Sequence, residues 1–156
     1  MRAARLLAWL AALAMPLTAS AAAPFRLASD DGRRWYAPGE LGGKPSVFLF
    51  WDVDCAPCLA ELKNARTLRA AWPEAVVVIA SLSPRDASAR ALGRYQVPAD
   101  VRRAMAPADP RGLLARLGNR AGALPFTAAF RADGRRCAAR LGPLDAQQMR
   151  ALAARC

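Results

Sequence analysis

The sequence predicts an α/β domain with a mixed central sheet flanked by helices on both faces. Ser46–Trp51 and Ala75–Leu82 are continuous apolar segments, typical of strands that are buried on both faces. Between them, apolar residues recur at helical spacing from Ala56 to Trp72, so the three elements form a parallel, right-handed βαβ unit. Asp133-Gly134 lies between two further short strands and is a strong hairpin signal, which adds antiparallel strands to the sheet.

Shorter elements complete the predicted order. Phe25–Ser29 and Arg34–Tyr36 flank the turn Asp31-Gly32, which predicts an N-terminal β-hairpin. Roughly 40 residues separate the second buried strand from Leu124-Pro125, too many for one crossover, so we expect an inserted helix–strand element before the proline. The remaining expected elements are a helix at Asp86–Tyr95, a strand at Val101–Met105, a helix at Arg111–Leu117, strands at Phe126–Arg131 and Arg135–Leu141, and a helix at Ala146–Ala154 capped by Asp145.

The first 21 residues have the pattern of a secretory signal peptide. A basic start with Arg2 and Arg5 precedes the uncharged apolar run Leu6–Met15, and Ala19-Ser20-Ala21 offers a cleavage site. We therefore expect a signal peptide at 1–21, a single domain at 22–156, and export to the periplasm. The alternative is an uncleaved N-terminal anchor that keeps the domain close to the membrane.

Composition excludes several function classes. The 156 residues include no histidine, which excludes Cys/His nucleophilic catalysis and any His-dependent metal site. The formal net charge is +11, but the arginines are scattered and lack aromatic or motif support, so we expect no nucleic-acid binding.

The chemistry of the chain centres on Cys55-Ala56-Pro57-Cys58, which directly follows a buried strand. If a helix begins at Cys55, its unpaired N–H groups and dipole favour a thiolate there. Cys55 can then attack a disulfide, and Cys58 can resolve the mixed disulfide. Pro57 fixes the backbone without the loss of a helical hydrogen bond. The alternatives are a structural disulfide and half of a zinc site, although Cys137 and Cys156 are not spaced as a second zinc-binding pair.

Together these motifs resemble the exported or membrane-tethered thioredoxin-like thiol–disulfide oxidoreductases of the TlpA/ResA type. The resemblance extends over Phe25–Ala154, including the insertion. The matching segments are Phe25-Arg26-Leu27 with Asp31-Gly32, Gly43-Lys44-Pro45, Phe50-Trp51, the Cys55–Cys58 motif, and Leu124-Pro125-Phe126-Thr127 followed by Asp133-Gly134.

The resemblance implies a thioredoxin-like fold and a role for particular residues. Cys55 would be the attacking thiol and Cys58 the resolving one. Pro125 would be a cis-proline opposite them, although a trans proline at the start of a strand is the commoner arrangement. Leu124 would offer backbone groups to an extended substrate. The expected substrate surface consists of Leu124, Pro125, Trp51 and Pro57.

Glu61 lies three residues after Cys58, so both occupy one helix face. In the family an acidic residue here relays protons to the cysteines; the alternative is a solvated carboxylate. The resemblance also implies a monomer without a cofactor that exchanges disulfides with partner proteins, such as apocytochrome c, and receives electrons from a membrane donor.

This sequence departs from the family pattern at two positions near the cysteines. Asp54 replaces the common tryptophan before Cys55, and a carboxylate there should raise the pKa of the Cys55 thiol. A less stable thiolate disfavours the reduced form, so we expect a reductant. Lys63 replaces a proline that usually kinks the helix, which favours a straighter helix.

Cys137 and Cys156 form the second pair of cysteines. In an oxidising compartment we expect them to form a structural disulfide that closes about 20 residues and stabilises the fold by about 3 kcal/mol. Two free thiols or an intermolecular bond from Cys156 are the alternatives. For the whole chain, the alternative function is a non-catalytic peptide-binding module with a permanent Cys55–Cys58 disulfide.

Overall fold

The computed structural model describes residues 23–156. The predicted signal peptide at 1–21 lies outside the described residues. Among residues 23–156, no helix combines the length and apolar character needed to cross a membrane.

The described chain contains a seven-stranded mixed sheet with the strand order β2-β1-β5-β4-β3-β6-β7. Strands β3, β4 and β5 are mutually parallel, and β6 and β1 pair antiparallel with β3 and β5 at the two sides of this group. The outermost strands β7 and β2 pair antiparallel with β6 and β1. The strands are β1 (Leu27–Ser29), β2 (Trp35–Tyr36), β3 (Ser46–Trp51), β4 (Val76–Ser81), β5 (Arg102–Met105), β6 (Phe126–Phe130) and β7 (Arg136–Leu141).

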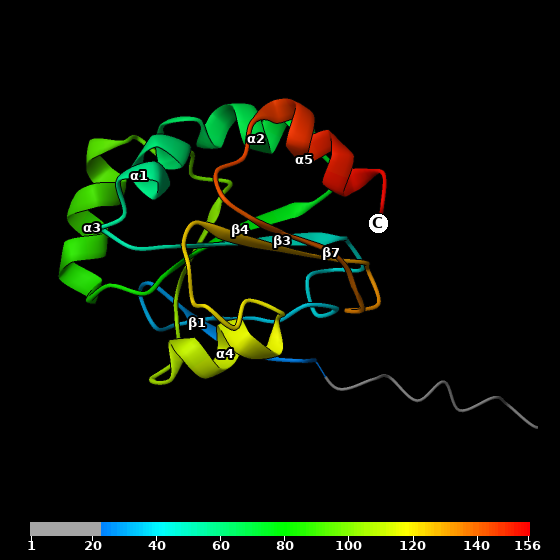
Figure 1. The fold of residues 1–156 in the computed structure, drawn as a ribbon, viewed down its shortest axis with the longest axis horizontal. Helices are drawn as coiled ribbons and strands as arrows, with labels where there is room; N and C mark the ends of the chain where they lie inside the picture. Colours follow the sequence, from blue (N-terminus) through cyan, green and yellow to red (C-terminus); the bar gives the residue numbers. More distant parts are fainter. Residues whose placement is uncertain (1–22) are drawn as a thin grey trace, which may run out of the picture.

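Helices cover both faces of this sheet (Figure 1). Buried residues of α1, α2, α3 and α5 pack on one face, and those of α4 pack on the other. The helices are α1 (Ala56–Lys63), α2 (Ala65–Ala71), α3 (Arg85–Arg94), α4 (Pro110–Arg116) and α5 (Ala146–Ala153). The predicted α/β class, with a mixed sheet between two helical layers, is therefore confirmed.

Strand β3 divides the core into its two halves. Its residues are all buried, and alternate side chains point to opposite faces because the side-chain period of a strand is two. Leu49 and Trp51 join the cluster under α1, α2, α3 and α5, whereas Phe48 and Phe50 join the cluster under α4. The second cluster is aromatic: Phe48 meets Phe130 edge to face with ring centroids 5.7 Å apart.

The long helix expected after the cysteines is interrupted. Asn64 ends α1 and precedes α2, and its N–H donates to the carbonyls of Glu61 and Leu62, the pattern of a tightened last turn. The expectation of a straighter helix was therefore wrong. Asparagine is a weak helix former, and the break lets both Leu62 and Leu68 be buried against the sheet.

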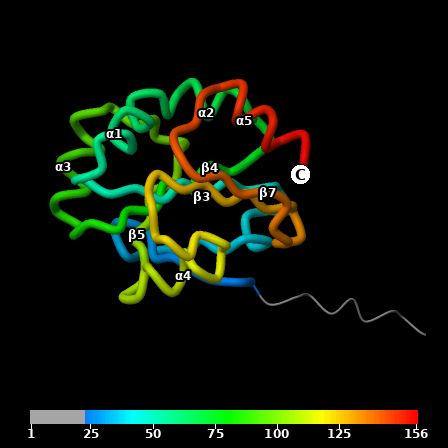
Figure 2. Tube along the Cα trace, viewed as in Figure 1, coloured from blue at the N-terminus to red at the C-terminus, as the bar shows by residue number. Residues whose placement is uncertain are grey.

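The C-terminal segment closes against the last strands (Figure 2). Helix α5 packs on α2, and the chain end lies near β7. A disulfide joins Cys137 in β7 to Cys156, across a sequence separation of 19. Arg131 adds hydrogen bonds to the carbonyls of Cys156 and Arg155, both 3.2 Å long. The end of α5 is thus held to the sheet by covalent and polar contacts.

Candidate active site

Cys55 follows the central strand β3 through a short loop with a defined conformation. The Cys55 N–H donates to the Asp52 carbonyl over 3.2 Å, and the Asp54 N–H donates to Asp52 Oδ1 over 2.9 Å. The Val53 N–H donates to Ser83 Oγ, 2.9 Å away, which ties the loop to the end of the neighbouring strand. Asp54 itself is exposed, so water and salt screen the effect of its charge on Cys55.

Cys55 and Cys58 form a disulfide at the start of α1, with their Cα atoms 5.2 Å apart. Cys55 is the N-cap of the helix, and its Sγ accepts the Cys58 N–H over 3.3 Å. Cys55 is partly exposed, whereas Cys58 is fully buried. Only the first sulfur is accessible to a partner, and the helix N-terminus is positioned to stabilise negative charge on it.

Pro57 is exposed in the first turn of α1, where the absent N–H would have had no helical partner. It therefore gives the disulfide an apolar border without weakening the helix.

The Leu124–Pro125 peptide bond is cis. Phe126 pairs with Phe50 in the β3–β6 ladder, so Pro125 lies beside the end of β3 from which the Cys55 loop departs. The Pro125 carbonyl accepts the Gly142 N–H over 2.9 Å. Leu124, by contrast, is partly exposed, and its backbone makes no hydrogen bond within residues 23–156. Its N–H and carbonyl are thus available to an added peptide strand.

Trp51 was expected on the substrate surface, but it is only 1% exposed and belongs to the core. The alternation along β3 turns its side chain towards α1 and away from solvent. We therefore assign Trp51 to packing behind the cysteines and omit it from the expected substrate surface.

Glu61 is buried on α1 one helical turn after Cys58, with 4% of its surface exposed. Its Oε1 accepts the Leu144 N–H over 2.8 Å, in surroundings that are otherwise formed by apolar residues such as Leu49 and Ile79. Burial raises the pKa of Glu61 to about 7, although the Leu144 hydrogen bond and the charge of Arg140 oppose the rise. The alternative of a solvated carboxylate is excluded by this burial.

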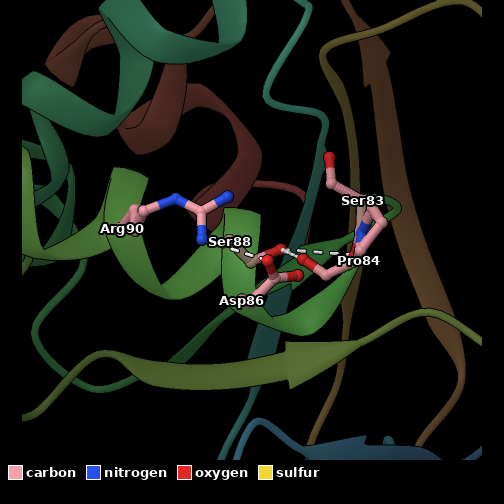
Figure 3. Close-up of polar contacts among 5 residues, drawn as sticks. All are labelled: Ser83, Pro84, Asp86, Ser88 and Arg90. Atoms are coloured by element: carbon pink, nitrogen blue, oxygen red, sulfur yellow. Dashed lines mark hydrogen bonds and ion pairs between the residues drawn. The ribbon is translucent and has the colours of Figure 1, made fainter.

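Three serines that the sequence analysis did not single out, Ser81, Ser83 and Ser88, connect the loop to α3. Figure 3 shows two of them, Ser83 and Ser88. Ser88 Oγ lies 2.6 Å from Ser81 Oγ and donates to the Pro84 carbonyl over 2.9 Å and to the Ser83 carbonyl over 3.3 Å. Ser83 in turn accepts the Val53 N–H. The sequence signal for this network was the presence of Ser81 and Ser83 at the end of an otherwise apolar strand. It could not identify their hydrogen-bond partners, since Val53 lies 30 residues from Ser83 in the chain.

No zinc site is formed by the described cysteines, because all four are joined in two disulfides. Among residues 23–156, no group of three His, Cys, Asp or Glu side chains is arranged to hold a metal ion.

A disulfide at the N-terminus of the helix after a central parallel strand, together with a cis-proline at the start of the neighbouring antiparallel strand, is typical of thioredoxin-like folds. No protein-family model matches the sequence, and no curated protein matches it either. Solved structures do match. DsbF of Mycobacterium tuberculosis, solved in mixed oxidized and reduced forms, is 23% identical with a TM-score of 0.66, over 83% of this chain and 92% of that one.

Two further structures agree with this comparison. A putative thiol:disulfide interchange protein DsbE from Chlorobium tepidum is 22% identical with a TM-score of 0.63, over 84% of this chain and 89% of that one. A thioredoxin-like protein from Aeropyrum pernix is 13% identical with a TM-score of 0.66, over 83% of this chain and 88% of that one. The predicted thioredoxin-like fold is thus confirmed.

Proposed function

We propose that the protein is an exported thiol–disulfide oxidoreductase that exchanges disulfides with partner proteins. The observation that carries the proposal is the asymmetry of its disulfide: Cys55 is partly exposed and its Sγ accepts a helix N-terminal N–H, whereas Cys58 is buried. In the reduced protein, the Cys55 thiolate attacks one sulfur of a substrate disulfide and expels the other as a thiolate. Cys58 then attacks Cys55 in the mixed disulfide, which releases the second substrate thiol and re-forms the Cys55–Cys58 disulfide.

Glu61 has the properties of a proton acceptor for Cys58. To attack, the Cys58 thiol must lose its proton in a site that excludes water, and Glu61 is buried one turn away on the same helix. A carboxyl with a pKa of about 7 can both accept and release a proton near neutral pH. Leu124 completes the site, because its free backbone N–H and carbonyl allow an extended substrate segment to add as a strand next to the cis-proline.

We further propose that the protein acts in the periplasm as a reductant, receiving electrons from a membrane donor. The leader-like pattern of residues 1–21 supports export. Asp54 beside Cys55 and Glu61 behind Cys58 place two carboxylates near the sulfurs, and negative charge disfavours thiolates and hence the reduced form.

Turnover of insulin disulfides with dithiothreitol tests the proposal. We expect catalysis by the wild type, none by Cys55→Ser, and a trapped mixed disulfide with Cys58→Ser. The Cys137→Ser/Cys156→Ser double variant is the matched control and should remain active. No turnover, together with no alkylation of Cys55 after reduction, would instead favour a binding module with a permanent disulfide.

The reduction potential of the Cys55/Cys58 couple, measured against glutathione buffers, tests the direction of electron flow. A reductant should have a potential closer to the roughly −270 mV of thioredoxin than to the roughly −120 mV of DsbA. A value near the second figure would contradict the assignment as a reductant.

A further inference from the structure

A groove of about 250 Å³ lies beside the redox loop, between α1 and α3. Val53 and Leu59, which flank the two cysteines in sequence, line it from the loop and from α1. The residues from α3 and its end are Ala87, Arg90, Ala91, Arg94 and Tyr95. The groove therefore combines apolar side chains from the redox loop and α1 with basic and aromatic side chains from α3 and its end.

The charges at this edge are predominantly positive. Arg90 binds Asp86 on its own helix over 3.0 Å, and both side chains are more than 70% exposed. Lys63 Nζ lies over the Tyr95 ring, 5.6 Å from its centroid. Arg94, exposed at the end of α3, has no ion-pair partner among residues 23–156. Lys63 and Arg94 are thus cations that no carboxylate of the described chain neutralises.

Hydrogen bonds hold the two walls of the groove together before any partner arrives. Ser83 accepts the Val53 N–H with its hydroxyl and the Ser88 hydroxyl with its carbonyl, so one residue connects the redox loop to α3. The Asp86–Arg90 pair lies on either side of Ser88 along the same helix (Figure 3). A groove that is already formed binds a partner at a lower entropic cost.

We propose that this groove binds the substrate segment that flanks the target disulfide and selects segments with an acidic side chain. The inference rests on the proposed function, since it assigns a substrate class to the same redox site. The segment's apolar atoms cover Val53 and Leu59, and its carboxylate meets Arg94, with Lys63 nearby. Asp54 beside Cys55 repels an acid at the attacked cysteine itself, so selection acts on a residue a few positions away.

Rates of oxidation of the reduced protein by matched disulfide peptides test this proposal. The peptides differ only by Glu, Gln or Lys placed a few residues from the cysteine. At low salt we expect the Glu peptide to react about threefold to tenfold faster than the Lys peptide. Arg94→Glu should abolish or reverse that preference, and added salt should weaken it.

Arg116→Glu is the matched control, because Arg116 is also the exposed last residue of a helix but lies on α4, across the sheet. It should leave the preference unchanged. Equal effects of Arg94→Glu and Arg116→Glu on the peptide preference would show that it depends only on the overall positive charge of the protein. That result would overturn the proposal that the groove selects the substrate. A peptide preference that Arg94→Glu leaves unchanged would overturn it as well.

A neutral disulfide, 2-hydroxyethyl disulfide, separates this proposal from the function on which it rests. It should oxidise the wild type and both arginine variants at equal rates. Failure of this disulfide to oxidise the wild type would refute the redox function itself. Normal oxidation without selectivity among the peptides would refute only the proposal that the groove selects acidic segments. Thermal unfolding of each variant verifies that the fold is retained.

Discussion

Substitution of Glu61 by glutamine should make the stability of the folded protein less dependent on pH. Glu61 is 4% exposed, and burial raises its pKa from the ordinary 4.5 to about 7. Between these two values the folded protein retains a proton that the unfolded chain has released. The free energy of unfolding must therefore fall as the pH rises from about 4.5 to about 7.

The size of this fall follows from the two pKa values of Glu61. Each pKa unit corresponds to about 1.4 kcal/mol, so an ionised Glu61 costs the folded state about 3 kcal/mol. Glutamine carries no charge at any pH, and its side-chain oxygen can still accept the Leu144 N–H. Burial of this neutral amide has a free-energy cost that does not depend on pH. The cost therefore cancels when the stability of Glu61→Gln at one pH is compared with its stability at another.

Urea unfolding of the oxidised wild type and of Glu61→Gln between about pH 4.5 and about pH 8 measures this effect. The stability of the variant relative to the wild type should rise by about 3 kcal/mol over that range. Glu74→Gln is the matched control, because Glu74 is exposed, and its relative stability should stay constant. If the stability of Glu61→Gln relative to the wild type is also constant over this pH range, the argument that burial raises the pKa of Glu61 is refuted.

Two further changes have defined outcomes. Replacement of Cys137 and Cys156 by serine removes a disulfide with a sequence separation of 19 and should lower the free energy of unfolding by about 3 kcal/mol, measured in urea. Unchanged stability would show that the bond does not constrain the unfolded chain. Asp54→Asn should speed alkylation of Cys55 near neutral pH by less than about threefold, because Asp54 is exposed. An unchanged alkylation rate at every pH would remove Asp54 from the tuning of this site.

Local sequence patterns predicted most of the fold. The apolar run Ser46–Trp51 has the same bounds in the structure as in the prediction, because a strand buried on both faces must be apolar throughout. The helix after the cysteines was predicted as continuous, yet it is interrupted at Asn64. Apolar spacing does not reveal such a break, since Leu62 and Leu68 are buried on either side of it.

Parts of the site depended on contacts between residues that are distant in the chain. Glu61 stood out by its spacing from Cys58, but the residue that satisfies its buried carboxylate is Leu144, 83 residues away. Trp51 was expected on the surface because it precedes the motif, and only the packing of α1 and α2 on β3 places it in the core. The groove of Arg94 requires α3 to lie beside the redox loop, which no local pattern predicts.

By itself the sequence determined the chemistry of this protein: two thiols at a helix start, a proline at the head of a later strand, and no histidine. The first two features are local, because a helix dipole and the backbone restriction of proline act over a few residues. The absence of histidine follows from the composition alone. Only the tertiary structure decided which cysteine is exposed, which carboxylate is buried away from water and which cations border the groove beside the redox loop. Burial and charge proximity are properties of packed surfaces, and distant segments create them together.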